Sequence, residues 1–197
     1  MVHPISRLPK RRGFLGLLSD TRGSELLEMA FGLPLLIVFM VGIADFGGAY
    51  NLKHRLSNAV REGARFAASE SPRDEFSNGS VCSCTPASVS AVRDVVANYL
   101  TNAGVTQCAV SASATQSGLQ WTFDSSTSGG GCGSFSLVID RNNTATTNGT
   151  ITIPVTHVSL TYPYTWQFNR VIGLLVKGAS PTLPPTISSD AKMENLA

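Results

Sequence analysis

The first strong pattern along the chain is an uninterrupted apolar run. No residue from Met29 to Ala44 is charged, and Leu26, Leu27 and the uncharged stretch Phe46 to Tyr50 lengthen the run on both sides. A helix of about 20 apolar residues is long enough to cross a bilayer. We therefore expect one transmembrane helix here. A cleavable secretory signal is the alternative, but the run is long for one and no small-x-small cleavage site follows it.

After this run the hydrophobic residues recur at helical spacing. Leu52, Leu56 and Val60 follow one another at intervals of four between charged residues, which predicts an amphipathic helix that leaves the membrane. No proline lies between Pro34 and Pro72. We therefore expect one rod from about Ser24 to Glu70, on the order of 70 Å long at 1.5 Å per residue.

Small residues form a ridge along this predicted rod. They form two sets, and within each set they recur every four residues, which lets another helix approach closely. The ridge either seats the outer domain of the same chain or packs against a neighbouring subunit. Its members are Ala44, Gly48, Ala59, Gly63 and Ala67.

The remaining chain predicts a mixed domain. Val89, Val92, Val96 and Leu100 share one helical face, and the helix should stop at Ala103-Gly104. The period then changes to two, which predicts strands at 106–114, 119–124, 134–140 and 150–162. Loops are expected at 125–133 and 142–149, and a final apolar stretch at 171–176 with an edge strand at 186–193 should complete the sheet. The fold class is α+β: a long N-terminal helix followed by a disulfide-bonded antiparallel sheet plus helix.

The charges are unevenly distributed. The chain carries 15 basic and 13 acidic residues, but residues 1–23 hold five of the bases and only one of the acids. The rest is slightly acidic, which argues against nucleic-acid binding. Short basic segments beside a membrane helix stay in the cytoplasm. Residues 1–23 should therefore lie inside and the bulk of the chain outside.

Glu28 is the most informative single residue. It lies five positions after Gly23, at the start of the apolar run. A carboxylate at bilayer depth costs roughly 2.5 kcal/mol or more, so one that is found there usually has a partner or a task. A basic leader ending in glycine, followed by glutamate at the fifth position, resembles the processing site of type IV prepilins.

Four blocks in fixed order extend this resemblance: residues 22–31, 33–36, 42–47 and 58–68. Together they are similar to the TadE-like pseudopilins of the tight-adherence (Flp) pilus system. The resemblance implies a minor pilin-like protein that a prepilin peptidase cuts between Gly23 and Ser24. It implies as partners other pilins or pseudopilins, the pilus assembly platform and membrane lipid. Glu28 would be the acid of the mature chain.

A physical role for Glu28 follows without the family. A cut after Gly23 creates an ammonium group on Ser24, and the Glu28 carboxylate could neutralise it within one helix or across to a neighbour, which offsets the cost of a buried charge. In a filament the repeated contact would set an axial register. The alternatives are a solvated carboxylate at headgroup level and a role only in peptidase recognition.

All four cysteines, Cys82, Cys84, Cys108 and Cys132, follow the predicted span, on the side expected to be oxidising. Two disulfides are predicted. Pairing of Cys82 with Cys84 is disfavoured because one intervening residue makes a cramped ring, so we expect these two to bond Cys108 and Cys132, in an order left open. A zinc site is disfavoured, because paired zinc ligands are usually separated by two to four residues.

Other chemistry lacks support. The motifs Cys-x-x-Cys, Gly-x-Ser-x-Gly and His-Glu-x-x-His do not occur, and the glycine run at 129–133 is not followed by Lys-Ser. We expect no enzyme activity, catalytic residue, metal or cofactor. One set of aromatic residues could form either core or an exposed cluster for a partner: Trp121, Tyr162, Tyr164, Trp166 and Phe168.

The sequence thus predicts three parts: a basic cytoplasmic prepilin-type leader (1–23), a transmembrane helix with an amphipathic stalk (24–70) and an extracytoplasmic α+β domain (71–197). The expected location is a bacterial inner membrane, crossed once, with pilus association. The expected function is pilus biogenesis and adhesion. The main alternative is an unprocessed, membrane-anchored binding or adhesion domain, and the second is an anchored metal or redox enzyme.

Overall fold

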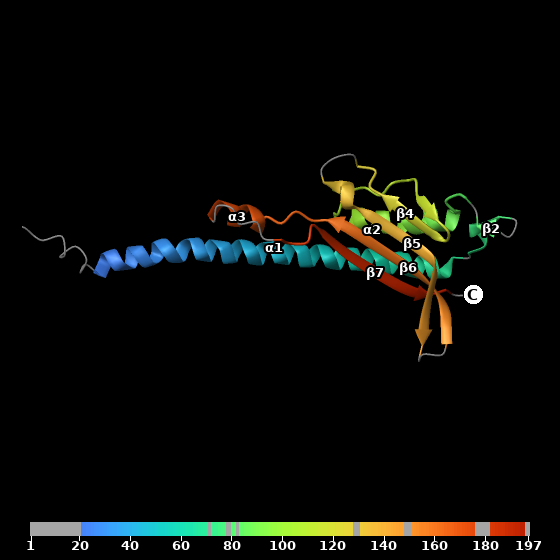
Figure 1. Cartoon of the computed structure of the whole chain (residues 1–197), viewed down its shortest axis with the longest axis horizontal. Coiled ribbons are helices and arrows are strands. Elements are labelled where there is room, and N and C mark those ends of the chain that lie inside the picture. The colour runs from blue at the N-terminus through green and yellow to red at the C-terminus, as the bar shows by residue number, and fades with distance from the viewer. Residues whose placement is uncertain are drawn as a thin grey trace, which may run out of the picture.

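The structure is a computed structural model that describes residues 21–70, 72–77, 80–81, 83–127, 131–147, 151–175 and 182–195. A long helix carries a mixed head at its C-terminal half (Figure 1). The expected α+β class is confirmed. The helices are α1 (Thr21–Ser69), α2 (Ala87–Asn102) and α3 (Phe168–Leu175), with 3₁₀ turns η2 (Pro72–Glu75) and η3 (Cys132–Ser134). The strands are β1 (Phe76–Ser77), β2 (Ser80–Val81), β3 (Thr115–Ser117), β4 (Gln120–Asp124), β5 (Ser136–Thr147), β6 (Ile151–Pro163) and β7 (Thr186–Glu194).

Helix α1 is a single helix of 49 residues that continues through Pro34. The next proline along the chain, Pro72, begins η2 just after α1 ends. Proline lacks an amide proton and is favoured at the first turn of a helix, so it separates the two elements. The rod predicted for residues 24–70 is therefore present almost residue for residue.

The sheet is a five-stranded antiparallel meander in the order β3-β4-β5-β6-β7. A separate two-stranded ribbon pairs β1 with β2. Helix α1 contacts β6, β7 and α2, so the C-terminal half of α1 and α2 pack together on the sheet. The predicted edge strand is confirmed as β7, which binds α1 directly, since the Lys53 ammonium donates to the Ser188 carbonyl oxygen.

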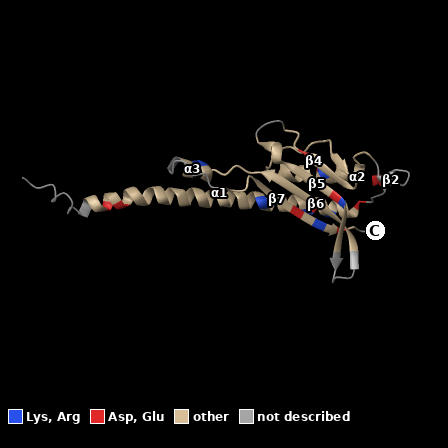
Figure 2. Cartoon of the chain, in the orientation of Figure 1, with Lys and Arg blue, Asp and Glu red and all other residues tan. Residues whose placement is uncertain are grey.

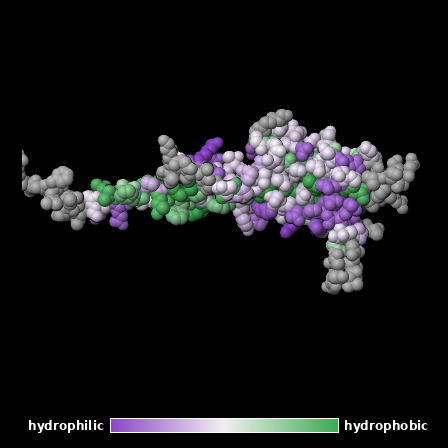
Figure 3. All heavy atoms as spheres, in the orientation of Figure 1, coloured by the Kyte–Doolittle hydropathy of each residue, from purple (hydrophilic) through white to green (hydrophobic). Residues whose placement is uncertain are grey.

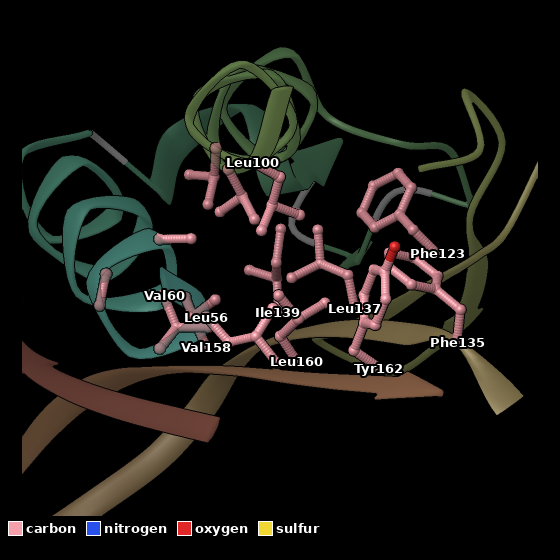
Figure 4. Packing of buried hydrophobic residues seen from close by; sticks show 14 of the residues in the cluster. Leu56, Val60, Leu100, Phe123, Phe135, Leu137, Ile139, Val158, Leu160 and Tyr162 are labelled. Carbon is pink, nitrogen blue, oxygen red and sulfur yellow. The ribbon is translucent and has the colours of Figure 1, made fainter. Parts of the chain in front are cut away.

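The core lies between these helices and the sheet (Figure 4). Leu56 and Val60 come from α1, and Leu100 comes from α2. Alternate residues of each strand point inward, as period-two patterns require. The inward set comprises Trp121 and Phe123 of β4, Leu137 and Ile139 of β5, and Val158, Leu160 and Tyr162 of β6, all buried.

One strand prediction and one loop prediction need correction. Residues 106–114 do not form a strand and contribute only the isolated bridge between Val110 and Ser125. Here serine and threonine side chains take hydrogen bonds that a strand would use. For example, the Ala109 amide donates to the Thr127 hydroxyl at 3.1 Å instead of to a neighbouring strand. The loop predicted at 142–149 is also wrong up to Thr147, where β5 still pairs with β6. The hairpin tip beyond Thr147 lies outside the described residues.

The apolar stretch at 171–176 was expected to finish the sheet, but residues 171–175 are instead part of helix α3, and Val176 lies outside the described residues. A short apolar run does not distinguish a strand from a buried helix by periodicity. Contacts from α1 decide the outcome, because the Asp45 carboxylate accepts a hydrogen bond from the Phe168 amide at 2.9 Å, at the first residue of α3. These two residues are 123 positions apart in the chain.

The expected pairing of the cysteines is wrong. Cys108 and Cys132 form a disulfide with their Cα atoms 5.6 Å apart, so neither can bond Cys82 or Cys84. Cys84 is also disulfide-bonded, whereas Cys82 lies outside the described residues. The fold brings the segment after α2 against η3, a proximity that the cysteine spacing does not contain. A native disulfide of this kind typically contributes about 2–4 kcal/mol.

A buried ion pair joins the sheet to the connection after α1. Arg141 continues the inward series of β5 and lies 2.7 Å from the Glu75 carboxylate of η2, with both side chains at most 2% exposed. The register of β5 on β6 shifts between Asp140 and Asn143, so Arg141 occupies a bulge. Burial raises the pKa of Glu75, and the Arg141 charge opposes that rise.

We expect Arg141→Met to destabilise the head by about 3–5 kcal/mol at neutral pH, because it leaves the Glu75 carboxylate buried without a counter-charge. Without Arg141 the pKa of Glu75 rises further. The folded state then binds a proton more tightly than the unfolded state, so stability returns as the pH falls through this raised pKa. Urea unfolding of the full chain in detergent at neutral and mildly acidic pH measures this.

The double variant Arg141→Met/Glu75→Gln is the control. Its deficit relative to the wild type should be smaller at neutral pH than that of the single variant, because no buried charge remains. An Arg141→Met deficit that does not change with pH would contradict an ionised Glu75 in the folded protein.

Candidate assembly site

The predicted processing junction lies at the exposed start of α1. Gly23, Ser24 and Glu28 are all exposed residues of its first two turns, while residues 1–20 lie outside the described residues. A Cβ atom added at Gly23 would meet no atom within 4 Å. Among the described residues, the Glu28 carboxylate makes no hydrogen bond or ion pair. No atom of the described residues therefore obstructs the junction.

The N-terminal half of α1 presents large apolar side chains that the head does not cover. Leu26, Phe31 and Ile43 are 72%, 75% and 75% exposed. Figure 3 shows this hydrophobic surface beyond the head, and Figure 2 shows that acidic residues near the start of α1 are followed by a long uncharged stretch. The helix from Gly23 to Ser69 is long and apolar enough to cross a membrane. So much exposed apolar surface marks a contact with lipid or protein.

The ridge of small residues divides into two parts. Ala59, Gly63 and Ala67 are buried in the head of the same chain. A Cβ atom at Gly63 would lie 2.5 Å from the Val96 Cγ2 atom of α2, so glycine is needed for this close approach of the two helices. In the structure this part of the ridge seats the chain's own head, which is the first of the two interpretations.

The other two ridge residues lie nearer the apolar half. Ala44 is exposed. Gly48 is also exposed, and a Cβ atom there would lie 3.0 Å from the Tyr164 hydroxyl. Ala44 therefore has a free face in the isolated chain, whereas Gly48 leaves room for the segment that leads into α3.

Asp45 is the residue whose importance the sequence analysis missed. It is 7% exposed, and its carboxylate accepts hydrogen bonds from the Phe168 amide at 2.9 Å and the Tyr164 hydroxyl at 3.1 Å. A carboxylate at the N-terminus of a helix is favoured by the exposed amides and by the helix dipole. The position of Asp45, directly after an uncharged run, is a signal that a partner should exist. Its partners could not be identified from sequence because they are more than 100 positions away.

The aromatic set divides as well. Trp121 and Tyr162 are core, but Tyr164, Trp166 and Phe168 pack on α1 around Asp45. The Trp166 ring lies 5.2 Å from that of Phe46, and its Nε1 atom donates to the Pro184 carbonyl at 2.7 Å. Burial raises the pKa of Tyr164, and the hydrogen bond to Asp45 adds to that rise. Tyr164 therefore remains a neutral donor to Asp45 at physiological pH.

Helix α3 is thus held to α1 at one end by both polar and apolar contacts. A Cβ atom at Gly42 would lie 3.4 Å from the Phe168 ring, so the ring rests against this glycine. Helix α3 itself projects from the head toward the N-terminal end of α1 (Figure 1). Within the described residues, no group of three His, Cys, Asp or Glu residues could hold a metal ion.

The segment that carries these features also has a recognisable family pattern. The family model described as TadE-like protein matches residues 23–65. This part of the chain is TadE-like. The match confirms the resemblance noted from the sequence, and it begins at Gly23 and includes Glu28 and Asp45. No curated protein and no solved structure matches the chain.

The TadE-like match indicates a component associated with a Tad pilus, with other pilus components as partners. Proteins of this kind are structural rather than enzymatic. The match includes the apolar N-terminal half of α1 and most of the C-terminal half, which packs in the head. It ends four residues before the end of α1 at Ser69. The sheet and α3 lie outside the matched residues and are described by the structure alone.

Replacing the Asp45 carboxylate should release α3 from α1. Hydrogen bonds to a charged group contribute about 1.5–3 kcal/mol each. We expect Asp45→Ala to increase the rate of tryptic cleavage after the exposed Arg170 of α3 by about tenfold or more, since 1.4 kcal/mol corresponds to a factor of ten. Limited proteolysis of the full chain in detergent, followed by mass spectrometry, measures this rate.

Ile43→Ala is the matched control, because Ile43 lies near Asp45 on α1 but is 75% exposed, whereas Asp45 is 7% exposed. Its cleavage rate after Arg170 should equal that of the wild type. If Asp45→Ala also leaves the rate unchanged, then Asp45 does not hold α3.

Proposed function

We propose that this chain is a pilin-like structural or assembly component of a Tad pilus, cut after Gly23 by a prepilin peptidase, and that it acts in pilus biogenesis and adhesion. It would consist of a leader (1–23), a membrane helix with its stalk (24–70) and an exported head (71–197). The observation that carries the proposal is the coincidence of the TadE-like match with an apolar half-helix that the head leaves bare.

The bare half-helix supports a membrane and assembly role. A side chain such as Phe31, 75% exposed, cannot remain in water together with many neighbours of the same kind. Lipid would cover this surface before assembly, and the helices of other pilus subunits would cover it afterwards. A soluble binding domain would need no such surface.

The proposed cut gives Glu28 a partner. Ser24 and Glu28 are four residues apart in α1, and residues at this spacing are neighbours on a helix surface. Cleavage would place an ammonium group on Ser24, which the Glu28 carboxylate could pair with in the same chain or in an adjacent subunit. Removal of residues 1–23 would also remove five basic residues that cannot enter the bilayer.

The orientation follows from charge. The basic leader would stay in the cytoplasm, which places the head on the outer side of the inner membrane. The disulfide between Cys108 and Cys132 fits that side, because disulfides persist in oxidising compartments. The partners would be the peptidase, other pilins or pseudopilins, the assembly platform and membrane lipid.

The cut can be tested directly. Mass spectrometry of the chain recovered from the envelope of its native host should find a mature N-terminus at Ser24. Gly23→Leu should abolish this N-terminus, because the peptidase would meet a bulky side chain at the cut. A Cβ atom at Gly23 meets no atom within 4 Å, so the variant should leave the fold of the described chain unchanged. Recovery of only uncut protein from wild-type cells would refute the processing step and favour an unprocessed, membrane-anchored binding domain.

The role of Glu28 can be tested with a matched control. We expect Glu28→Ala to insert into the membrane normally but to reduce piliation strongly, because it removes the proposed partner of the Ser24 amine. Glu25→Ala removes an equally exposed acid one turn earlier and should leave piliation near the wild-type level. Pili counted by electron microscopy provide the measurement. Equal piliation in both variants would contradict a charge-pairing role for Glu28.

A further inference from the structure

Helix α3 lies beside the apolar part of α1, at a level where a membrane would end. About 20 residues span the hydrocarbon core of a bilayer. A span that starts at Leu26, after Glu25, reaches Asp45, the first charged residue beyond Glu28. Phe168, the first residue of α3, binds α1 at Gly42 and Asp45. From there α3 extends toward the N-terminal end of α1 (Figure 1).

The polarity of α3 changes along its length in the sense that a bilayer requires. Its first turn carries Asn169 and the exposed Arg170, at the level of Asp45. The next residues toward its far end are Val171-Ile172-Gly173-Leu174-Leu175, all uncharged. The eight residues of α3 extend about 12 Å at 1.5 Å per residue, well short of crossing a bilayer.

An aromatic cluster marks the same level independently. Phe46 of α1 contacts Trp166, and Trp166 contacts Tyr164 with 4.9 Å between ring centroids. Tyr164 and Trp166 both have their polar atoms satisfied by nearby oxygens, from Asp45 and Pro184. Tryptophan and tyrosine are enriched where the hydrocarbon meets the headgroups. The cluster lies just beyond the uncharged run, where the first argument places the boundary.

From these observations we propose that α3 enters the head-side leaflet of the membrane that α1 crosses, beside α1, with Arg170 among the lipid phosphates. The partner is therefore lipid: acyl chains around Val171 and Ile172 and phosphate groups at Arg170. Arginine near the end of a buried segment reaches phosphate oxygens while its stem stays in the apolar region. The Asp45 bonds satisfy the first amide of α3, as a low-dielectric environment requires.

The insertion gives the head a fixed position on the membrane. A single helix anchor leaves a domain free to tilt and rotate, whereas a second inserted element close to it restricts both motions. The proposal goes beyond the proposed function, because it requires that α1 cross a membrane but neither the cut after Gly23 nor a pilus. The two can therefore fail separately.

Spin labels on single cysteines test the proposal. The full chain is placed in vesicles of phosphatidylethanolamine and phosphatidylglycerol, with a label at Ile172→Cys or Arg170→Cys. Phe39→Cys, on the bare part of α1, is the membrane reference, and Thr106→Cys, exposed on the head, is the aqueous reference. The unsubstituted chain controls for labelling of native cysteines. Collision with oxygen reports lipid, and collision with a water-soluble nickel chelate reports water.

We expect the oxygen-to-nickel ratio at Ile172 to match that at Phe39 and to exceed that at Thr106, with Arg170 between the two references. A ratio at Ile172 equal to that at Thr106 would overturn the proposal, because α3 would lie in water. Inaccessibility to both reagents, with spin–spin broadening, would also overturn it, because a second copy would cover α3. The Arg170 label is a second probe of α3. Because Arg170 is exposed and Ile172 is half-buried, the Arg170→Cys variant should retain the fold even if Ile172→Cys disturbs it. A Phe39 label in water would overturn the premise that α1 spans the membrane.

Discussion

A single helix must satisfy two different environments, and this constraint governs the rest of the structure. The C-terminal half of α1 forms part of the core of the head, where Leu56 and Val60 are fully buried. The N-terminal half has large apolar side chains that are mostly exposed, with α3 beside only its last part. The change occurs near Asp45, where a buried carboxylate receives the hydrogen bonds of Phe168 and Tyr164. Beyond Asp45, α1 packs into the head, whereas before Asp45 it exposes an apolar surface that lipid or other helices could cover.

Two carboxylates hold the head to α1 at opposite ends of their contact. Asp45 binds the segment that enters α3, and Glu75 of η2, just past the other end of α1, binds Arg141 of β5. Both carboxyl groups are buried, and a buried acid is costly without partners and specific in geometry with them. Between them Gly63 allows α2 to approach α1 closely. The head is therefore fixed in register along the rod at both ends, so movement of α1 would be transmitted to the sheet.

Local patterns in the sequence predicted the elements whose environment is local, and failed where distant residues decide. The face of Val89, Val92, Val96 and Leu100 predicted α2, because helical spacing alone defines it. The stretch at 171–176 was predicted to complete the sheet, but residues 171–175 belong to α3, whose first residue, Phe168, is held by Asp45 and Gly42 of α1. No pattern within ten residues carries that information.

The same reasoning explains the errors at the site. The spacing of the cysteines disfavoured a cramped ring between Cys82 and Cys84, but it could not reveal the pairing of Cys108 with Cys132, which depends on how the fold brings the segment after α2 against η3. Periodicity identified Ala59, Gly63 and Ala67 as a contact ridge, yet it could not say that the partner is the chain's own α2 and sheet. The roles of Gly23, Ser24 and Glu28 stay predictions, and they rest on a linear signal, a motif beside an apolar run.

The division of the ridge limits how α1 can meet a neighbour. Because the head occupies the face of Ala59, Gly63 and Ala67, the part of α1 within the head offers other helices only its outer face, where Arg61, Glu62 and Arg65 are exposed. Close apolar packing between rods is therefore confined to the stretch before Asp45, where Ala44 is still free and Phe168 already covers Gly42. A neighbouring helix that packs closely along this stretch must approach from the side away from α3. The position of α3 thus determines which face of the apolar half-helix remains available for assembly.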